Sequence, residues 1–188
     1  MFIRSERLFL RPGWPEDWPE LLARIGDEGV VKNLARAPWP YIEGDARDFA
    51  QRPQDPRCPH FFVTLPTSAA PAELVGCVGL ANDGDEVELG YWFGREHWGR
   101  GYATEAARAV LRLARTLGHR RIVAKHFTDN HASGRVLAKL GFRPSGEVRP
   151  SYSLARGCDV PAVVHTAEFG ASSDCDSDDD GFSGMRAA

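Results

Sequence analysis

The alternation of hydrophobic and polar residues along this chain predicts a sheet with helices around it. Runs that are rich in β-branched and aromatic residues and bounded by turn residues are typical of strands. They fall at residues 60–65, 73–80, 87–93, 121–127, 147–154 and 160–169. Short turns at 82–84 and 156–159 join neighbouring runs. We therefore expect an α/β (α+β) fold whose mixed sheet is mostly antiparallel.

Helical patterns fall into two groups. Three short helices are expected at 15–25, 27–35 and 44–51, before the first long strand. A longer amphipathic helix is expected from Thr104 to Gly118, because its apolar and charged residues separate onto two faces. The apolar face holds Ala106, Ala107, Val110, Leu111, Ala114 and Leu117, and the charged face holds Glu105, Arg108, Arg112 and Arg115.

One more helix should follow the strand at 121–127. Asp129, Asn130 or Ser133 can cap its start, and Gly141 is a typical helix terminator. Its buried side would carry Val136, Leu137 and Leu140.

The segment between the strand at 87–93 and the long helix contains a glycine turn. Gly99, Gly101 and the small Ala103 let the backbone approach a ligand closely. The start of the following helix offers unpaired N–H groups and the positive end of the helix dipole, and Arg100 adds charge there. This arrangement suits a pyrophosphate.

The spacing of this turn separates the ligand families that use one. A nucleoside-triphosphate loop needs Gly-Lys-Ser/Thr four residues after its first glycine, and no such run occurs. A dinucleotide turn needs Gly or Ala three residues after its second glycine, where this chain has Thr104. A regulator that binds ATP or NAD is therefore disfavoured.

Three segments together resemble one known family. Trp-Gly-Arg-Gly-Tyr-Ala-Thr-Glu-Ala at 98–106 resembles the acetyl-CoA turn of the GNAT N-acetyltransferases, in the branch of the RimJ/RimL-type ribosomal-protein N-terminal acetyltransferases. Residues 5–12 resemble the first strand of that branch, and residues 128–142 resemble its second signature. The segments occur in the family's order, which chance does not readily produce.

The resemblance implies a sheet of about six to seven strands, splayed between the fourth and fifth, which end at Phe93 and Phe127. Acetyl-CoA would lie in that gap as the co-substrate. Direct transfer of its acetyl group to an amine would need no metal ion. The implied cofactor-binding residues are Trp92, Phe93, Trp98, Gly99, Arg100, Gly101, Tyr102, Ala103, Thr104, Asn130 and Ser133. Within this set, the Phe93 N–H is implied as oxyanion donor and Asn130 as a contact to the pantetheine.

Amide formation requires a neutral amine, a donor for the oxyanion and a donor for the departing sulfur. Glu88 is our candidate base, because it lies on the strand that leads to the turn; His126 and His131 are alternatives. Many GNAT enzymes protonate the thiolate with a Tyr at the position of Leu137. The resemblance to the RimJ/RimL-like branch assigns that role to Ser133 instead.

Two functions from different classes follow from these residues. The first is an acetyl-CoA-dependent N-acetyltransferase that acts on a primary amine, either a protein N-terminus or a small molecule. The second is a non-catalytic CoA-binding sensor or scaffold of the same fold. This alternative remains because Leu137 stands where many GNAT enzymes have the Tyr that protonates the thiolate. Aromatic residues beside the strand (Tyr91, Trp92, Trp98) and in the helical region (Trp14, Trp18, Trp39) either line the ligand sites or pack in the core.

Composition adds the outer limits. The 188 residues suit one domain at 1–170, followed by an acidic tail at 171–188 that contains five Asp and one Arg. The formal net charge is −3 and the tail accounts for it, so the body is nearly neutral and shows no nucleic-acid stripe. No long apolar run suggests a membrane span, and four scattered cysteines (58, 77, 158 and 175) suit reduced thiols. We expect a cytoplasmic monomer or homodimer.

Overall fold

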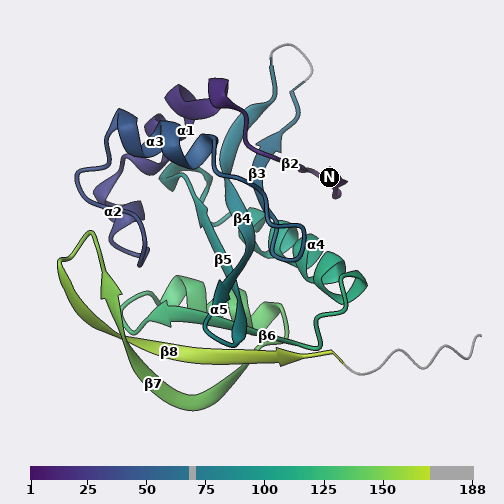
Figure 1. Cartoon of the computed structure of the whole chain (residues 1–188), viewed down its shortest axis with the longest axis vertical. Coiled ribbons are helices and arrows are strands. Elements are labelled where there is room, and N and C mark those ends of the chain that lie inside the picture. Colours follow the sequence, from purple (N-terminus) through teal and green to yellow (C-terminus); the bar gives the residue numbers. More distant parts are fainter. Residues whose placement is uncertain (68–70, 170–188) are drawn as a thin grey trace, which may run out of the picture.

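The computed structural model describes residues 1–67 and 71–169 of the chain. Eight strands form one sheet in the order β1-β2-β3-β4-β5-β6-β8-β7. Their bounds are β1 Ile3–Arg4, β2 Phe9–Arg11, β3 His60–Leu65, β4 Glu73–Asp83, β5 Glu86–Phe93, β6 Arg121–Phe127, β7 Arg143–Ser153 and β8 Cys158–Glu168. The helices are α1 Trp18–Ile25, α2 Glu28–Val31, α3 Glu43–Ala50, α4 Tyr102–Thr116 and α5 His131–Lys139, with single turns η1 Pro15–Asp17 and η2 Arg95–His97 (Figure 1).

The sheet is antiparallel everywhere except at its centre. There β5 and β6 run parallel, and within the described part of the chain one residue pair, Glu88 with Val123, bridges them. That pair lies near the start of both strands, so the strands separate toward their ends at Phe93 and Phe127. The splay therefore lies between the two strands at which the family resemblance implied it.

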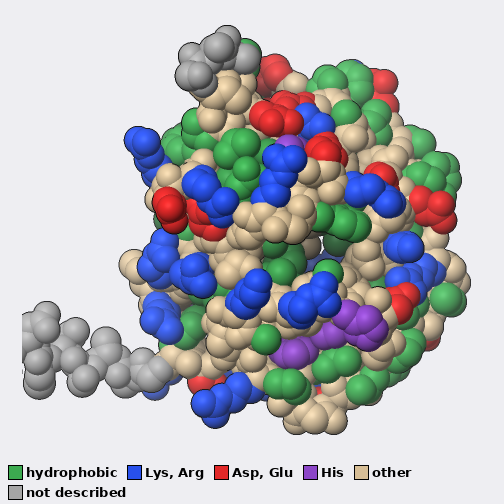
Figure 2. Space-filling model, turned by 180° about the vertical axis from the view of Figure 1, so that it is seen from behind, with side chains coloured by type: hydrophobic (Ala, Val, Ile, Leu, Met, Phe, Trp, Pro, Cys, Tyr) green, Lys and Arg blue, Asp and Glu red, His purple; other side chains and the backbone are tan. Residues whose placement is uncertain are grey.

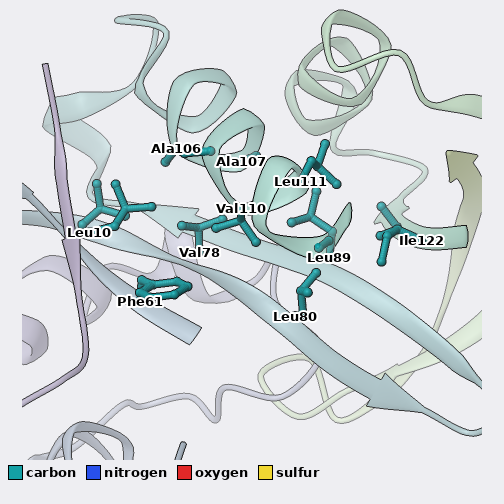
Figure 3. Packing of buried hydrophobic residues seen from close by; sticks show 14 of the residues in the cluster. Leu10, Phe61, Val78, Leu80, Leu89, Ala106, Ala107, Val110, Leu111 and Ile122 are labelled. Atoms are coloured by element: carbon teal, nitrogen blue, oxygen red, sulfur yellow. The ribbon is translucent and has the colours of Figure 1, made fainter. Parts of the chain in front are cut away.

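Helices cover the two faces of the sheet separately. On one face α4 and α5 enclose a first core cluster, with Leu10, Phe61, Val78, Leu89 and Val110 among its members (Figure 3). On the other face α1, α2 and α3 enclose a second core cluster that contains Leu21, Val31, Phe62 and Trp92. Side chains of a strand alternate between these two faces.

That alternation assigns the side chains of β5. Leu89 and Phe93 lie in the first core cluster, and Tyr91 packs against it. Trp92 lies in the second core cluster, so Glu88, four residues earlier, points to the same face as Trp92. Residues that are close in sequence thus serve opposite sides of the sheet.

Several element boundaries differ from the sequence-based expectation. The sheet has eight strands rather than the expected six to seven. The first edge, expected as one strand at 5–12, is divided into β1 at Ile3–Arg4 and β2 at Phe9–Arg11. Helix α4 begins at Tyr102, two residues before Thr104, because Gly101 adopts a left-handed conformation (φ 80°) directly before it. Strand β7 begins at Arg143, three residues beyond the end of α5 at Lys139, rather than at residue 147.

Helix α2 is also shorter than the expected 27–35. It ends at Val31, and the carbonyl groups beyond it bond to the turn between β7 and β8. The N–H of Leu154 donates to the Ala35 carbonyl (3.0 Å), and Arg156 Nε donates to the Lys32 carbonyl (2.9 Å). These tertiary bonds replace the helical ones.

Two further expectations concern the whole chain. The acidic tail at 171–188, with Cys175, lies outside the described residues, whereas Cys58, Cys77 and Cys158 are free thiols. Among the helices described, none has the length and apolar character needed to cross a membrane.

Candidate functional site

A cleft of about 880 Å³ runs along the splay between β5 and β6 and receives residues from both helical layers. Figure 2 shows a hollow near the middle of one face, with Lys and Arg side chains around it. Of the candidate site residues from the sequence, all except Arg100 line this cleft: Glu88, Trp92, Phe93, Trp98, Gly99, Gly101, Tyr102, Ala103, Thr104, Asn130 and Ser133. Segments far apart in the chain therefore meet in one place.

The glycine turn forms one end of the cleft. Gly99 and Gly101 both have positive φ angles, 75° and 80°, which residues other than glycine rarely adopt. No side chain in the described part of the chain caps α4, so N–H groups of its first turn remain available where Ala103 and Thr104 line the cleft. Together with the helix dipole, these groups suit an anionic ligand.

The N-terminal segment holds this turn in place through Glu105. The Glu105 carboxylate accepts hydrogen bonds from Ser5 Oγ (2.7 Å), from the Arg7 N–H (2.7 Å) and from Arg7 Nε (2.8 Å). Arg7 Nη1 also donates to the Arg100 carbonyl (3.1 Å), which ties the N-terminal segment to the backbone of the turn. Burial favours the neutral acid, but the bonds from Arg7 and Ser5 outweigh it and lower the pKa of Glu105.

The aromatic residues in and beside the turn are held by contacts within the protein. Trp98 Nε1 donates to the Phe93 carbonyl (2.7 Å), which ties the turn to the end of β5. The Tyr102 side chain is buried in the first core cluster, with the Arg7 guanidinium over its ring. Trp92 packs in the second core cluster, on the opposite face of the sheet.

The backbone at the end of β5 offers a free donor toward the splay. The Gly94 N–H donates to the Val75 carbonyl in β4 (3.0 Å). Consecutive N–H groups of a strand point to opposite sides, so the Phe93 N–H points away from β4 and toward the gap beside β6. This geometry fits the expected oxyanion donor.

The start of α5 brings two expected residues together. Asn130 is the cap: its Oδ1 accepts the Ser133 N–H (3.2 Å), so the cap is neither Asp129 nor Ser133. The Ser133 hydroxyl lies 2.8 Å from the hydroxyl of Tyr91, which reaches it from β5. Leu137 is fully buried in the first core cluster. A polar pair thus faces the cleft from the α4/α5 side.

Glu88 faces the cleft from the α1–α3 side of the sheet. Burial raises the pKa of Glu88 above its ordinary value, and the charges of Lys125 and Arg36 oppose that shift. Arg36 Nη2 lies 3.3 Å from the Glu88 carboxylate, and its own side chain is 58% exposed. A half-buried carboxylate with a raised pKa is a suitable proton acceptor near neutral pH.

The alternative bases have other surroundings. His126 lines the cleft, but Nδ1 lies 2.9 Å from the Phe127 carbonyl and Nε2 lies 3.2 Å from His165 Nε2, so both of its nitrogens are engaged. His131 is exposed at the start of α5 and does not line the cleft. Asp129 lies in the preceding turn and forms an ion pair with Arg156 (2.8 Å).

The α1–α3 side of the cleft is built by the loop after α2 and by α3. Leu34, Ala37, Tyr41 and Phe49 line it. Trp14, Trp18 and Trp39 do not; Trp18 packs against the second core cluster, whereas Trp14 and Trp39 are exposed.

Sequence reasoning missed Arg36 and the contact between Tyr91 and Ser133. Side chains alternate along the strand at 87–93, so Tyr91 should share the sheet face of Phe93 and lie opposite Glu88. That face is the one covered by α4 and α5, and α5 carries Ser133. Arg36 had no such signal, because it lies beyond the end of α2 in an irregular segment.

The Glu105 contacts predict a pH-dependent contribution to stability. Because the pKa of Glu105 is lowered by folding, the ionised carboxylate stabilises the fold above its ordinary pKa of ~4.3, and this contribution is lost as the pH falls through the lowered value. We expect Glu105→Gln to lower the free energy of unfolding by about 1–3 kcal/mol at pH 7. Urea unfolding at a series of pH values should show the difference shrinking in acid.

Glu43→Gln is the matched control, because the pair of Glu43 with Arg47 is exposed and should contribute only about 0.3–0.5 kcal/mol. An equal loss for both variants would contradict the role given to Glu105.

Comparison with known proteins bears on the whole arrangement. A family model described as an acetyltransferase (GNAT) domain matches residues 7–143. An uncharacterised N-acetyltransferase of Bacillus subtilis is 42% identical over 171 residues, which are 87% of this chain and 94% of that protein. The ribosomal protein uS5-alanine N-acetyltransferase of Escherichia coli is 36% identical over 88 residues, 43% of this chain and 45% of that enzyme.

Solved structures show the same fold. The crystal structure of a GNAT-family acetyltransferase from Bacillus anthracis superposes with a TM-score of 0.75 at 25% identity, covering 89% of this chain and 98% of that one. With the family model covering well over half of its length, this chain belongs to the GNAT acetyltransferases, the acyltransferase family that uses acetyl-CoA.

Proposed function

We propose that this protein transfers an acetyl group from acetyl-CoA to a primary amine by direct attack, within a domain at 1–170. The observation that carries the proposal is the cleft along the splay of the sheet, which brings the candidate residues together. The glycine turn and Ser133 line its α4/α5 side, and Glu88 lines its α1–α3 side. The donor would occupy the first side and the amine would enter from the second.

Glu88 would accept the proton that the amine loses. An α-amino group with a pKa near ~8 needs only about 1.4 kcal/mol for deprotonation at pH 7, whereas a lysine-like amine near ~10.4 needs about 4.6 kcal/mol. A carboxylate with a raised pKa therefore suffices for an N-terminal amine.

The other groups act on the thioester. As the C–N bond forms, the Phe93 N–H would donate to the carbonyl oxygen that becomes negative. As the C–S bond breaks, the electron pair passes to the sulfur and Ser133 Oγ would donate to it. The N–H groups of the first turn of α4 would hold the pyrophosphate, and Asn130 would contact the pantetheine amides.

The acceptor is proposed to be a protein N-terminus, with a small-molecule amine as the second candidate. The partial similarity to the uS5-alanine N-acetyltransferase supports the first, as does the RimJ/RimL-like signature at 98–106. The energetics of deprotonation favour the same choice.

Thiol release from acetyl-CoA, measured with a panel of amines, tests this function. We expect turnover with peptides that begin with a small residue such as alanine and carry a free α-amino group, and none with the same peptides blocked at that amine. Turnover confined to small amines would support the second acceptor class. Binding of acetyl-CoA without turnover of any amine would contradict the enzymatic proposal and support the alternative function, a CoA-binding sensor or scaffold.

Gly101→Val tests the glycine turn as the binding site for acetyl-CoA. The substituted residue would have to adopt a φ of 80°, which costs side chains of this type at least 1–2 kcal/mol, and a shifted turn would displace the α4 N–H groups. We expect acetyl-CoA affinity in calorimetry to fall at least tenfold while the protein stays folded. Gly44→Val, in an exposed helix turn away from the cleft, is the control. Unchanged affinity for Gly101→Val would exclude this turn as the binding site.

The pH profile of kcat/KM tests Glu88. The base works when ionised, so activity should fall as the pH drops through the raised pKa of Glu88. Arg36→Ala removes a charge that lowers this pKa, so its acidic limb should move to higher pH. Glu88→Gln should lose at least 100-fold in kcat, within the range of general-base catalysis.

Glu86→Gln is the control for both variants, because Glu86 lies on the same face of β5 and is paired with Arg121 and Arg149. If Arg36→Ala and the parent have identical pH profiles, Arg36 does not influence the pKa of the base. If Glu88→Gln is fully active, Glu88 is not the base.

A further inference from the structure

The contact between Tyr91 and Ser133 is unexplained by packing alone. The two hydroxyl groups lie 2.8 Å apart, although the residues are 42 positions apart in the chain and belong to β5 and α5. Tyr91 packs its ring against the first core cluster, and both residues line the cleft. The hydrogen bond thus joins β5, which borders the splay, to α5, which follows β6, on the side where the acetyl donor would lie.

The hydrogen-bonding options of the pair are limited. The Tyr91 hydroxyl can donate to Ser133 Oγ (2.8 Å) or to the Ser133 carbonyl (3.3 Å). When it donates to Oγ, the Ser133 hydrogen is free to point elsewhere, and the cleft is the open side. Burial raises the pKa of Tyr91 to about 12, so the phenol remains a donor throughout the working pH range.

Ser133 by itself is a flexible donor. A serine hydroxyl rotates freely, and its backbone N–H is already committed to the Asn130 cap (3.2 Å). Leu137, one turn further along α5, is 1% exposed and apolar, so α5 supplies no second donor there. Among the described residues, the Tyr91 hydroxyl on β5 lies within hydrogen-bonding distance of the Ser133 hydroxyl and can restrain it.

We propose that Tyr91 is the positioning residue of the leaving-group site: it donates to Ser133 Oγ and so aims the Ser133 hydrogen at the sulfur of the departing thiolate. This inference rests on the proposed function. In the reaction the C–N bond forms, the C–S bond breaks and its electron pair goes to sulfur. The amine proton goes to Glu88. Tyr91 and Ser133 both keep their protons: the Ser133 hydroxyl donates a hydrogen bond to the thiolate, which leaves as the anion and takes a proton from water.

The first test needs no turnover. The thiol pKa of CoA bound to the protein is measured from the ultraviolet absorbance of the thiolate across pH, for the parent, Tyr91→Phe and Ser133→Ala. We expect the bound thiol of the parent to titrate about one pH unit lower than in either variant, a tenfold difference that corresponds to ~1.4 kcal/mol. The same thiol pKa in the parent and in Tyr91→Phe would overturn the proposal.

The second test separates positioning from an independent effect. Tyr91→Phe keeps the ring and its packing, so melting temperature and acetyl-CoA affinity should be unchanged while kcat falls about tenfold. The double variant Tyr91→Phe/Ser133→Ala should be no slower than Ser133→Ala, because Tyr91 acts through Ser133. A double variant that shows the product of both single losses would contradict that coupling.

Tyr152→Phe, which removes a hydroxyl from an exposed tyrosine of β7 outside the cleft, is the control and should match the parent. Failure of the proposed function gives a different result: CoA would bind and its thiol pKa would still respond to Tyr91, but no amine would be acetylated. A parent protein that does not bind CoA would overturn both.

Discussion

The single bridge between β5 and β6 is the constraint on which the rest of the molecule depends. Backbone N–H and C=O groups of a central strand are normally paired by both neighbours, and leaving them unpaired in a closed interior is costly. Here β5 is paired by β4 along its length, whereas β6 leaves it after Glu88 and Val123. The open edge of β5 faces the cleft, where water or the amides of a ligand can pair with its backbone groups.

Polar contacts on the surface hold the borders of this opening. Glu105 joins the N-terminal segment to the glycine turn on the α4/α5 side. On the α1–α3 side, Arg156 bonds both the Lys32 carbonyl and Asp129, so the turn between β7 and β8 is joined to the loop after α2 and to the start of α5. Each contact connects segments that are distant in sequence, and together they give the cleft two differently built walls. The proposed donor and acceptor sites would therefore not compete for one surface.

Local spacing explains which parts of the site were predictable. Gly101 and Ala103, and likewise Asn130 and Ser133, lie within a few residues of one another at helix starts, where backbone geometry follows directly from residue type. The early end of α2 was unpredictable, because carbonyl groups at Lys32 and Ala35 bond to a hairpin more than a hundred residues away. The approach of Arg36 to Glu88 depends on that same tertiary contact, and no periodicity encodes it.

A crystal structure of the protein with CoA tests the central claim most directly. We expect the pantetheine arm between the ends of β5 and β6 and the pyrophosphate on the first-turn N–H groups of α4. We also expect the sulfur within hydrogen-bonding distance of Ser133 Oγ, with Glu88 open to the opposite side. CoA bound away from the splay, or a sulfur directed toward the α1–α3 wall, would contradict the division of the cleft into donor and acceptor sides.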